Sequence, residues 1–156
     1  MTVQAMADFH VAVGERASFS KTVSESDVYL FAGITGDFAP NHVNEAAMRR
    51  TPYGTRIAHG ALLVGYMSTT STMICAKSLA RGGDETPVSL GYDRVRFLKA
   101  VKLGETITVS YTVTEIDPAR RRARARVEIA NERGELCAVA EHLLKWVKGA
   151  AAEKAL

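Results

Sequence analysis

The chain has 156 residues, of which 47% are hydrophobic and 24% charged, enough apolar material for one compact domain with its own core. The formal net charge of +3 and the pI near 9.0 are too weakly basic to indicate a nucleic-acid-binding protein. The N-terminal residues lack a basic start followed by an apolar run, so we expect no secretory signal and a cytoplasmic location.

The first part of the chain predicts one strand followed by a helix. Residues 17–23 can form a short strand after an irregular lead-in over 1–16. Ser24 is a typical helix N-cap with acidic residues in the turn behind it, and apolar residues then recur at helical spacing. Gly36 is typical of a helix end, so the helix is predicted to stop there.

A short helix and a long helix are predicted next. Pro40 breaks the chain, residues 44–50 can form a short helix, and 51–54 read as a turn. A long helix begins near Gly60, and the apolar character of its first turns on nearly all sides predicts burial. Five consecutive Ser and Thr residues interrupt the apolar run over 60–80, which argues against a membrane span.

The second half of the chain predicts an antiparallel sheet. Strands are expected over residues 88–101, 105–116, 122–130 and 136–147. Gly91 indicates a bulge in the first of them. A single buried helix needs a curved sheet around it, so the predicted fold class is α+β, with an antiparallel sheet wrapped around a long central helix. One domain over 1–148 is expected, followed by a tail over 149–156 that frays.

Three residues before and at the start of the long helix favour acid–base chemistry. Asp37 and His42 lie five residues apart on a short loop, and such a pair can move protons to and from a substrate. The backbone N–H of Gly60, with the positive end of the helix dipole behind it, can stabilise an oxyanion. Each residue alone is more often structural, but together they favour catalysis. His59 is interpreted as ordering the start of the helix.

The element order and the segment 29–60 resemble the hot-dog fold and, within it, the MaoC-like (R)-specific enoyl-CoA hydratase family. The family motif runs from an aromatic residue through Gly-Asp-x-Asn-Pro-aliphatic-His, and it is matched here by Tyr29, Gly36, Asp37, Pro40 and His42. The segment 57–60 is similar to the start of the family's central helix.

The sequence departs from the family pattern at three positions. The motif's Asn falls on Ala39 and its aliphatic residue on Asn41. A Ser that some members carry in the central helix corresponds to Gly65 here. These changes weaken the support of the loop and remove one polar substrate contact, but they keep the acid–base pair.

The resemblance implies an enzyme of fatty acid metabolism, a hydro-lyase that interconverts trans-2-enoyl and (R)-3-hydroxyacyl thioesters. Asp37 and His42 would be the acid–base pair, and Gly60 would hold the thioester oxygen. Expected substrate-binding residues are Asn41, Tyr53, Arg56 and Gly65. The substrate would be an acyl-CoA or acyl-carrier-protein thioester, with no metal or other cofactor. Because hot-dog sheets have open edges, a homodimer or larger assembly is expected.

Two other functions stay open from the sequence. A hot-dog thioesterase would hydrolyse the same thioester, although hydrolysis needs no proton delivered to carbon. A non-catalytic acyl-thioester binder is kept open by Ala39 and Gly65. The alternating Arg122, Arg124 and Arg126 predict a solvated strand face, with a phosphate contact to coenzyme A as the less favoured interpretation.

Overall fold

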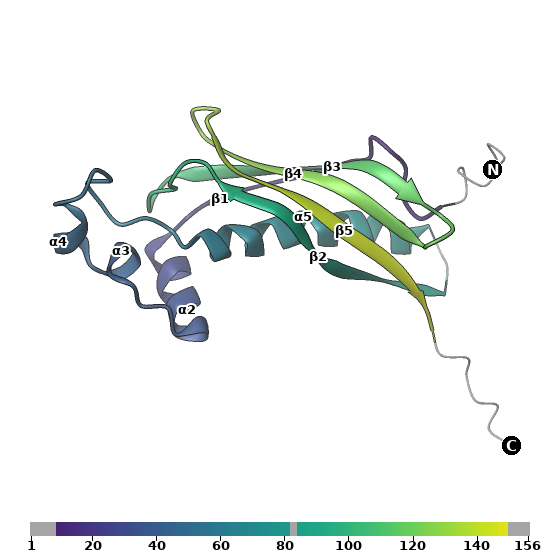
Figure 1. Ribbon diagram of the computed structural model, residues 1–156, viewed down its shortest axis with the longest axis horizontal. Helices are drawn as coiled ribbons and strands as arrows, with labels where there is room; N and C mark the ends of the chain where they lie inside the picture. Colours follow the sequence, from purple (N-terminus) through teal and green to yellow (C-terminus); the bar gives the residue numbers. More distant parts are fainter. Residues whose placement is uncertain (1–8, 82–83, 150–156) are drawn as a thin grey trace, which may run out of the picture.

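The computed structural model describes residues 9–81 and 84–149. A five-stranded antiparallel sheet curves over one side of the long helix α5 (Gly60–Ala80), and three shorter helices lie beside the start of α5 (Figure 1). This arrangement confirms the predicted α+β fold with one central helix. The expected fraying concerns residues that, apart from Gly149, lie outside the described part of the chain.

The strand order places two strands at open edges. The strands are β1 (Arg16–Thr22), β2 (Glu85–Phe97), β3 (Thr106–Asp117), β4 (Arg122–Asn131) and β5 (Leu136–Lys148). Their order in the sheet is β1-β3-β4-β5-β2, and all neighbours are antiparallel. The chain therefore leaves one edge at β1, crosses beneath the sheet through α5, and returns at the opposite edge as β2.

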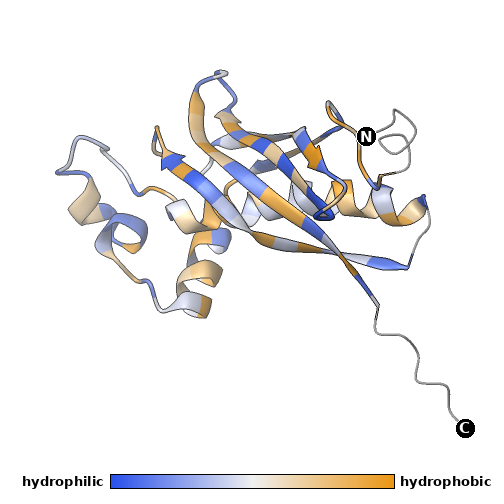
Figure 2. Ribbon diagram, turned by 45° about the vertical axis from the view of Figure 1, so that its right-hand side comes forward, coloured by the Kyte–Doolittle hydropathy of each residue, from blue (hydrophilic) through white to orange (hydrophobic). Residues whose placement is uncertain are grey.

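Alternation along β3, β4 and β5 divides the sheet into an apolar inner face and a polar outer face. On β3 the inner residues Ile107, Val109, Tyr111 and Val113 are at most 1% exposed, as the period of two predicted. Figure 2 shows the same alternation as changing colours along the strands. The inner face packs on α5, so the core lies between the sheet and this helix.

Strand β2 differs from its prediction at both ends and carries two irregularities. It starts at Glu85 and ends at Phe97, because the chain then turns away to bond with the segment before α5. The predicted bulge at Gly91 is confirmed by a register shift there and a φ of 139°. A second shift lies between Asp93 and Arg96.

The short helices begin where the sequence supplies caps. Helix α2 (Glu25–Thr35) starts with a capping box between Ser24 and Asp27, and it ends at Gly36, whose φ of 80° suits glycine. Helix α4 (Glu45–Met48) is capped by the side chain of Asn44 and is shorter than the predicted helix over 44–50.

Pro40 does more than break the chain. It is the first residue of the one-turn helix α3 (Pro40–Val43). A proline is tolerated there because the backbone N–H at the first helical position has no partner within the helix.

Only one side of α5 is buried in the single chain, so the burial predicted for its first turns holds for that side and not for the other. The buried side carries Leu63, Tyr66, Met67, Thr70, Ser71, Ile74 and Ser78. The opposite side leaves Ala61, Gly65, Ser68, Thr72, Met73, Ala76 and Leu79 exposed. The helix is apolar on both sides, but the sheet covers one. No helix in the described residues is long and apolar enough to cross a membrane.

A buried histidine sits in the sheet side of the core. His142 is fully buried, with Nδ1 2.9 Å from the Tyr111 hydroxyl and Nε2 2.8 Å from the Ser89 hydroxyl. The ring of Tyr92 stacks on it at 4.4 Å. Burial disfavours the charged imidazole and lowers the pKa of His142 to about 4.

We expect His142 to make folding stability depend on pH. The unfolded histidine titrates near 6.5 and the folded one near 4, so the unfolded state binds more protons in this window. The contribution of neutral His142 to the free energy of unfolding is therefore complete above pH 6.5. It falls by about 3 kcal/mol in total as the pH drops through the folded pKa. Urea unfolding across the window checks this. His142→Gln should flatten the dependence, and an unchanged slope in that variant would contradict the assignment.

Candidate active site

The loop after α2 separates an exposed carboxylate from a buried imidazole. Gly36 turns the chain out of α2, so Asp37 follows at the surface. Helix α3 then carries His42 inward, where it is 7% exposed. The Asp37 carboxylate accepts the N–H of Ala39 at 3.3 Å, which steadies the loop where the family motif has an Asn.

The ring of His42 is held in one orientation and one neutral tautomer. Its Nδ1 lies 2.8 Å from the carbonyl oxygen of Ile57, which only accepts, so Nδ1 carries the hydrogen. The Nε2 atom is then the basic nitrogen, and the side-chain amide of Asn41 lies 3.2 Å from it. Asn41 therefore helps to position the imidazole.

His59 supports His42 from the other side. Its ring stacks on that of His42 with centroids 3.7 Å apart and planes 24° from parallel. Its Nε2 donates to the carbonyl oxygen of Asp37 at 2.9 Å, which ties the loop to the start of α5. This agrees with the interpretation that His59 orders the helix start, but the stacking was not foreseen.

The donor atoms of Asp37, His42 and His59 lie within 4.8 Å of one another. Such a set could in principle bind a metal ion. However, the lone pairs of an imidazole lie in the ring plane, and two nearly parallel stacked rings do not direct them at one ion. A water molecule fits better between Asp37 and His42, since each of its hydrogen bonds spans about 2.8 Å.

Gly60 begins α5 and leaves its N–H available. The side chain of His59 does not cap the helix, and within the described residues the Gly60 N–H forms no hydrogen bond. A Cβ at this position would lie 2.6 Å from the ring of Phe97, so a side chain here requires that ring to move. Phe97 was missed from the sequence, because no local pattern links the end of β2 to the start of α5.

A pocket of about 440 Å³ joins these elements. Its lining consists of Asn41, His42, Tyr53, Ile57, Ala58, Gly60, Ala61, Leu63, Phe97, Leu98, Lys99, Ala100 and Val101. The structure thus brings four of the expected site residues to one cavity, with the Asp37 carboxylate beside His42. Arg56 and Gly65 are not part of the lining, so substrate contact for them stays a prediction.

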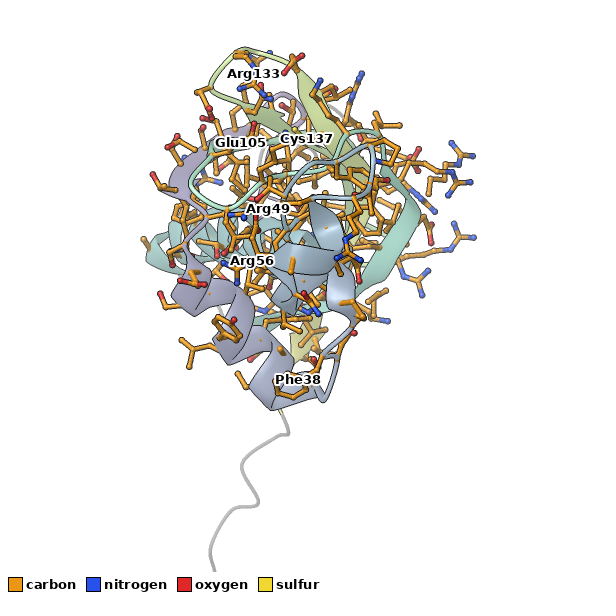
Figure 3. All side chains as sticks on the ribbon, turned by 90° about the vertical axis from the view of Figure 1, so that its left-hand side faces the viewer. Phe38, Arg49, Arg56, Glu105, Arg133 and Cys137 are labelled. Atoms are coloured by element: carbon orange, nitrogen blue, oxygen red, sulfur yellow. The ribbon has the colours of Figure 1, made fainter. Side chains whose placement is uncertain are left out.

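Arg56 instead joins helix α2 to helix α4. Its guanidinium bonds to Glu25 of α2 at 2.6 Å and to Glu45 of α4 at 3.3 Å, and it donates to the Tyr29 hydroxyl at 3.2 Å. The backbone N–H of Arg56 holds the pKa of Glu45 below its usual range. Figure 3 shows Arg56 among these helices, at the end of the molecule where α5 begins.

A sheet curved around one helix defines a hot-dog domain, and its candidate site holds two imidazoles, a carboxylate and a free helix N–H. Residues 8–133 match the MaoC-like domain family, and the chain belongs to this family. An (R)-specific enoyl-CoA hydratase from Rhodospirillum rubrum is 39% identical over 108 residues, 69% of this chain and 69% of that protein. A 3-hydroxybutyryl-CoA dehydratase from Methylorubrum extorquens is 38% identical over 112 residues, 72% of this chain and 66% of that protein.

Solved structures share the fold. The (R)-hydratase from A. caviae superposes with a TM-score of 0.74 at 26% identity, covering 86% of this chain and 96% of that one. The R-hydratase PhaJ1 from Pseudomonas aeruginosa gives 0.71 at 28% identity, covering 92% of this chain and 89% of that one. The predicted family and hot-dog fold are therefore confirmed.

We expect Arg56→Met to destabilise the fold by about 1 kcal/mol, because it removes charge-assisted hydrogen bonds from a largely buried guanidinium. Arg49→Met is the matched control. Arg49 contacts the same Glu45 at 3.6 Å, but its side chain is 73% exposed, so its loss should have little effect. Thermal melts of both variants check this, and equal melting temperatures would contradict the role of Arg56.

Proposed function

We propose that the protein hydrates trans-2-enoyl thioesters to (R)-3-hydroxyacyl thioesters and catalyses the reverse dehydration. The observation that carries the proposal is one pocket lined by His42 and by Gly60 with its unpaired N–H, together with the Asp37 carboxylate within 4.8 Å of the His42 ring. The named relatives are a hydratase and a dehydratase, which bears out the predicted hydro-lyase class.

The acid–base pair would carry one proton from water to the substrate during hydration. Asp37 takes this proton from a bound water, whose oxygen then forms a bond to the β-carbon. The short separation of the two groups lets the proton pass from Asp37 to the basic Nε2 of His42. From Nε2 it is delivered to the α-carbon, while the Nδ1–H of the ring stays bonded to Ile57. Such proton transfers contribute about 100- to 10,000-fold each.

The helix start would stabilise the charge that forms on the thioester oxygen. As the α-carbon gains or loses its proton, the thioester passes through an enolate-like state. The N–H of Gly60 points from the positive end of a 21-residue helix, where negative charge is favoured. The thioester itself acidifies the α-carbon, so the mechanism uses these residues without a cofactor.

The two rival functions predict different products. A thioesterase would release free thiol from a saturated acyl-CoA, whereas a hydratase leaves that substrate intact. A non-catalytic binder would bind enoyl-CoA without turnover. The orientation of His42 by Asn41 and Ile57 favours a reactive imidazole over a merely structural one.

Asp37→Asn and His42→Ala should each reduce crotonyl-CoA hydration by at least about 100-fold, because each removes a proton-transfer group. The loss of enoyl absorbance measures the rate, and circular dichroism checks that the fold is intact. Turnover at the parent rate in either folded variant would remove that residue from the mechanism.

Gly60→Val should reduce turnover by about 100-fold, because it displaces Phe97 and obstructs the approach to the N–H. Stability should fall much less, since the ring of Phe97 is 54% exposed and can swing away. Gly33→Val is the matched control, on an exposed position of helix α2 where an added Cβ meets nothing within 4 Å. The crotonyl-CoA hydration rate and the melting temperature are measured for both variants and for the parent protein. Equal rates in the two variants would show that the oxyanion assignment is wrong.

We also propose that the chain works as a homodimer or larger assembly. The free edge of β2 and the exposed side of α5 leave apolar residues uncovered, among them Val88, Leu90, Met73 and Leu79. Pairing of edge strands and burial of the helix would cover them. Sedimentation at micromolar concentration should show at least a dimer, and a fully active monomer would contradict the proposal. Cytoplasmic location stays a prediction.

A further inference from the structure

A second cavity lies on the outer face of the sheet, next to the candidate active site. It has a volume of about 720 Å³ and is lined by Arg94, Arg96, Thr114, Arg126, Val139, Ala140 and Glu141. We call it the arginine groove. Its Arg96 is followed directly by Phe97, which lines the active-site pocket and covers Gly60. The last two residues of β2 therefore line one cavity each.

An irregularity in β2 adds positive charge to this face. Successive strand residues normally point to opposite faces. At the second bulge, however, Asp93 bonds to Arg124 and the next residue, Arg94, bonds to Glu141, both on the outer face. Arg94 adopts a φ of 51°, which is rare for a residue with a side chain. A costly backbone conformation that gathers cations beside a reactive site suggests a function for them.

The guanidinium groups of the groove are weakly engaged. Arg94 pairs with Glu141 and Arg126 with Glu128, but the arginine side chains are 78% and 64% exposed, and such pairs contribute little to stability. Arg96 forms no salt bridge within the described residues, and its guanidinium donates only to the carbonyl oxygen of Val95. These groups can therefore exchange their contacts for an incoming anion.

We propose that the arginine groove binds the phosphate groups at the nucleotide end of a coenzyme A thioester whose acyl end lies in the active-site pocket. The proposal rests on the proposed function for the identity of the substrate. Guanidinium forks match phosphate oxygens in two parallel hydrogen bonds, and three of them line one groove. A hollow of this size fits a small molecule, whereas a carrier protein would need a broad complementary surface.

Binding of adenosine 3′,5′-bisphosphate tests the groove without any turnover. Calorimetry on the full chain should detect this probe, and Arg96→Ala should weaken its binding about fivefold or more. Arg122→Ala is the matched control. Arg122 is also exposed on the outer face of the sheet, at the start of β4, but it lines a different cavity. Absence of binding to the parent protein, or equal weakening in both variants, would overturn the proposal.

Kinetics with two substrates separate the groove from the catalytic site. Arg96→Ala should raise the KM for crotonyl-CoA about fivefold and leave that for crotonyl-N-acetylcysteamine, which lacks phosphates, unchanged. Equal changes for both substrates, or no change for crotonyl-CoA, would overturn the proposal. Asp37→Asn should still bind the bisphosphate. A parent protein that binds the bisphosphate but hydrates neither substrate would refute the proposed function and leave the groove as an anion site.

Discussion

The candidate site depends on the hydrogen bonds that hold residues 57–59 between two other parts of the chain. On one side, Ile57 exchanges two bonds with residues 41–42, through its N–H at 3.0 Å and its carbonyl at 2.8 Å. On the other side, the N–H of Ala58 donates to Val101 at 2.8 Å. The start of α5 is thereby fixed relative to both the acid–base loop and the segment that follows β2.

This arrangement gives His59, which has no assigned role in the chemistry, a structural role in the site. His59 carries the last of these bonds, to the carbonyl of Asp37, and its ring supports His42 by stacking. The two rings and the helix N–H then belong to one rigid unit, and reacting groups held in place need little reorganisation. Arg56 extends the unit by joining α2 and α4 around it.

Local patterns in the sequence predicted most of the fold. The strands follow from alternation, as on β3, and the limits of α2 follow from Ser24 and Gly36. The predicted partnership of Asp37 and His42 followed from their short separation in sequence. What local patterns do not encode is contact between distant segments. Phe97 over Gly60 is such a contact.

The exposure of α5 was mispredicted for a related reason. Its sequence is apolar on both sides, but the pattern does not say whether the sheet or another chain covers each side. Arg56 shows the same limit, because its ion-pair partners come from α2 and α4, whereas the sequence suggested only a contact with substrate.

The two faces of the sheet differ in what they can contact, and this constrains any assembly. The inner face is filled by α5, and the outer face carries alternating charges whose burial against a second sheet would require removing them from water. Apolar association is therefore directed to the β2 edge and the open side of α5. An assembly built there leaves the arginine groove accessible, so the same charge pattern that disfavours sheet-to-sheet packing keeps a cationic surface open beside the active-site pocket.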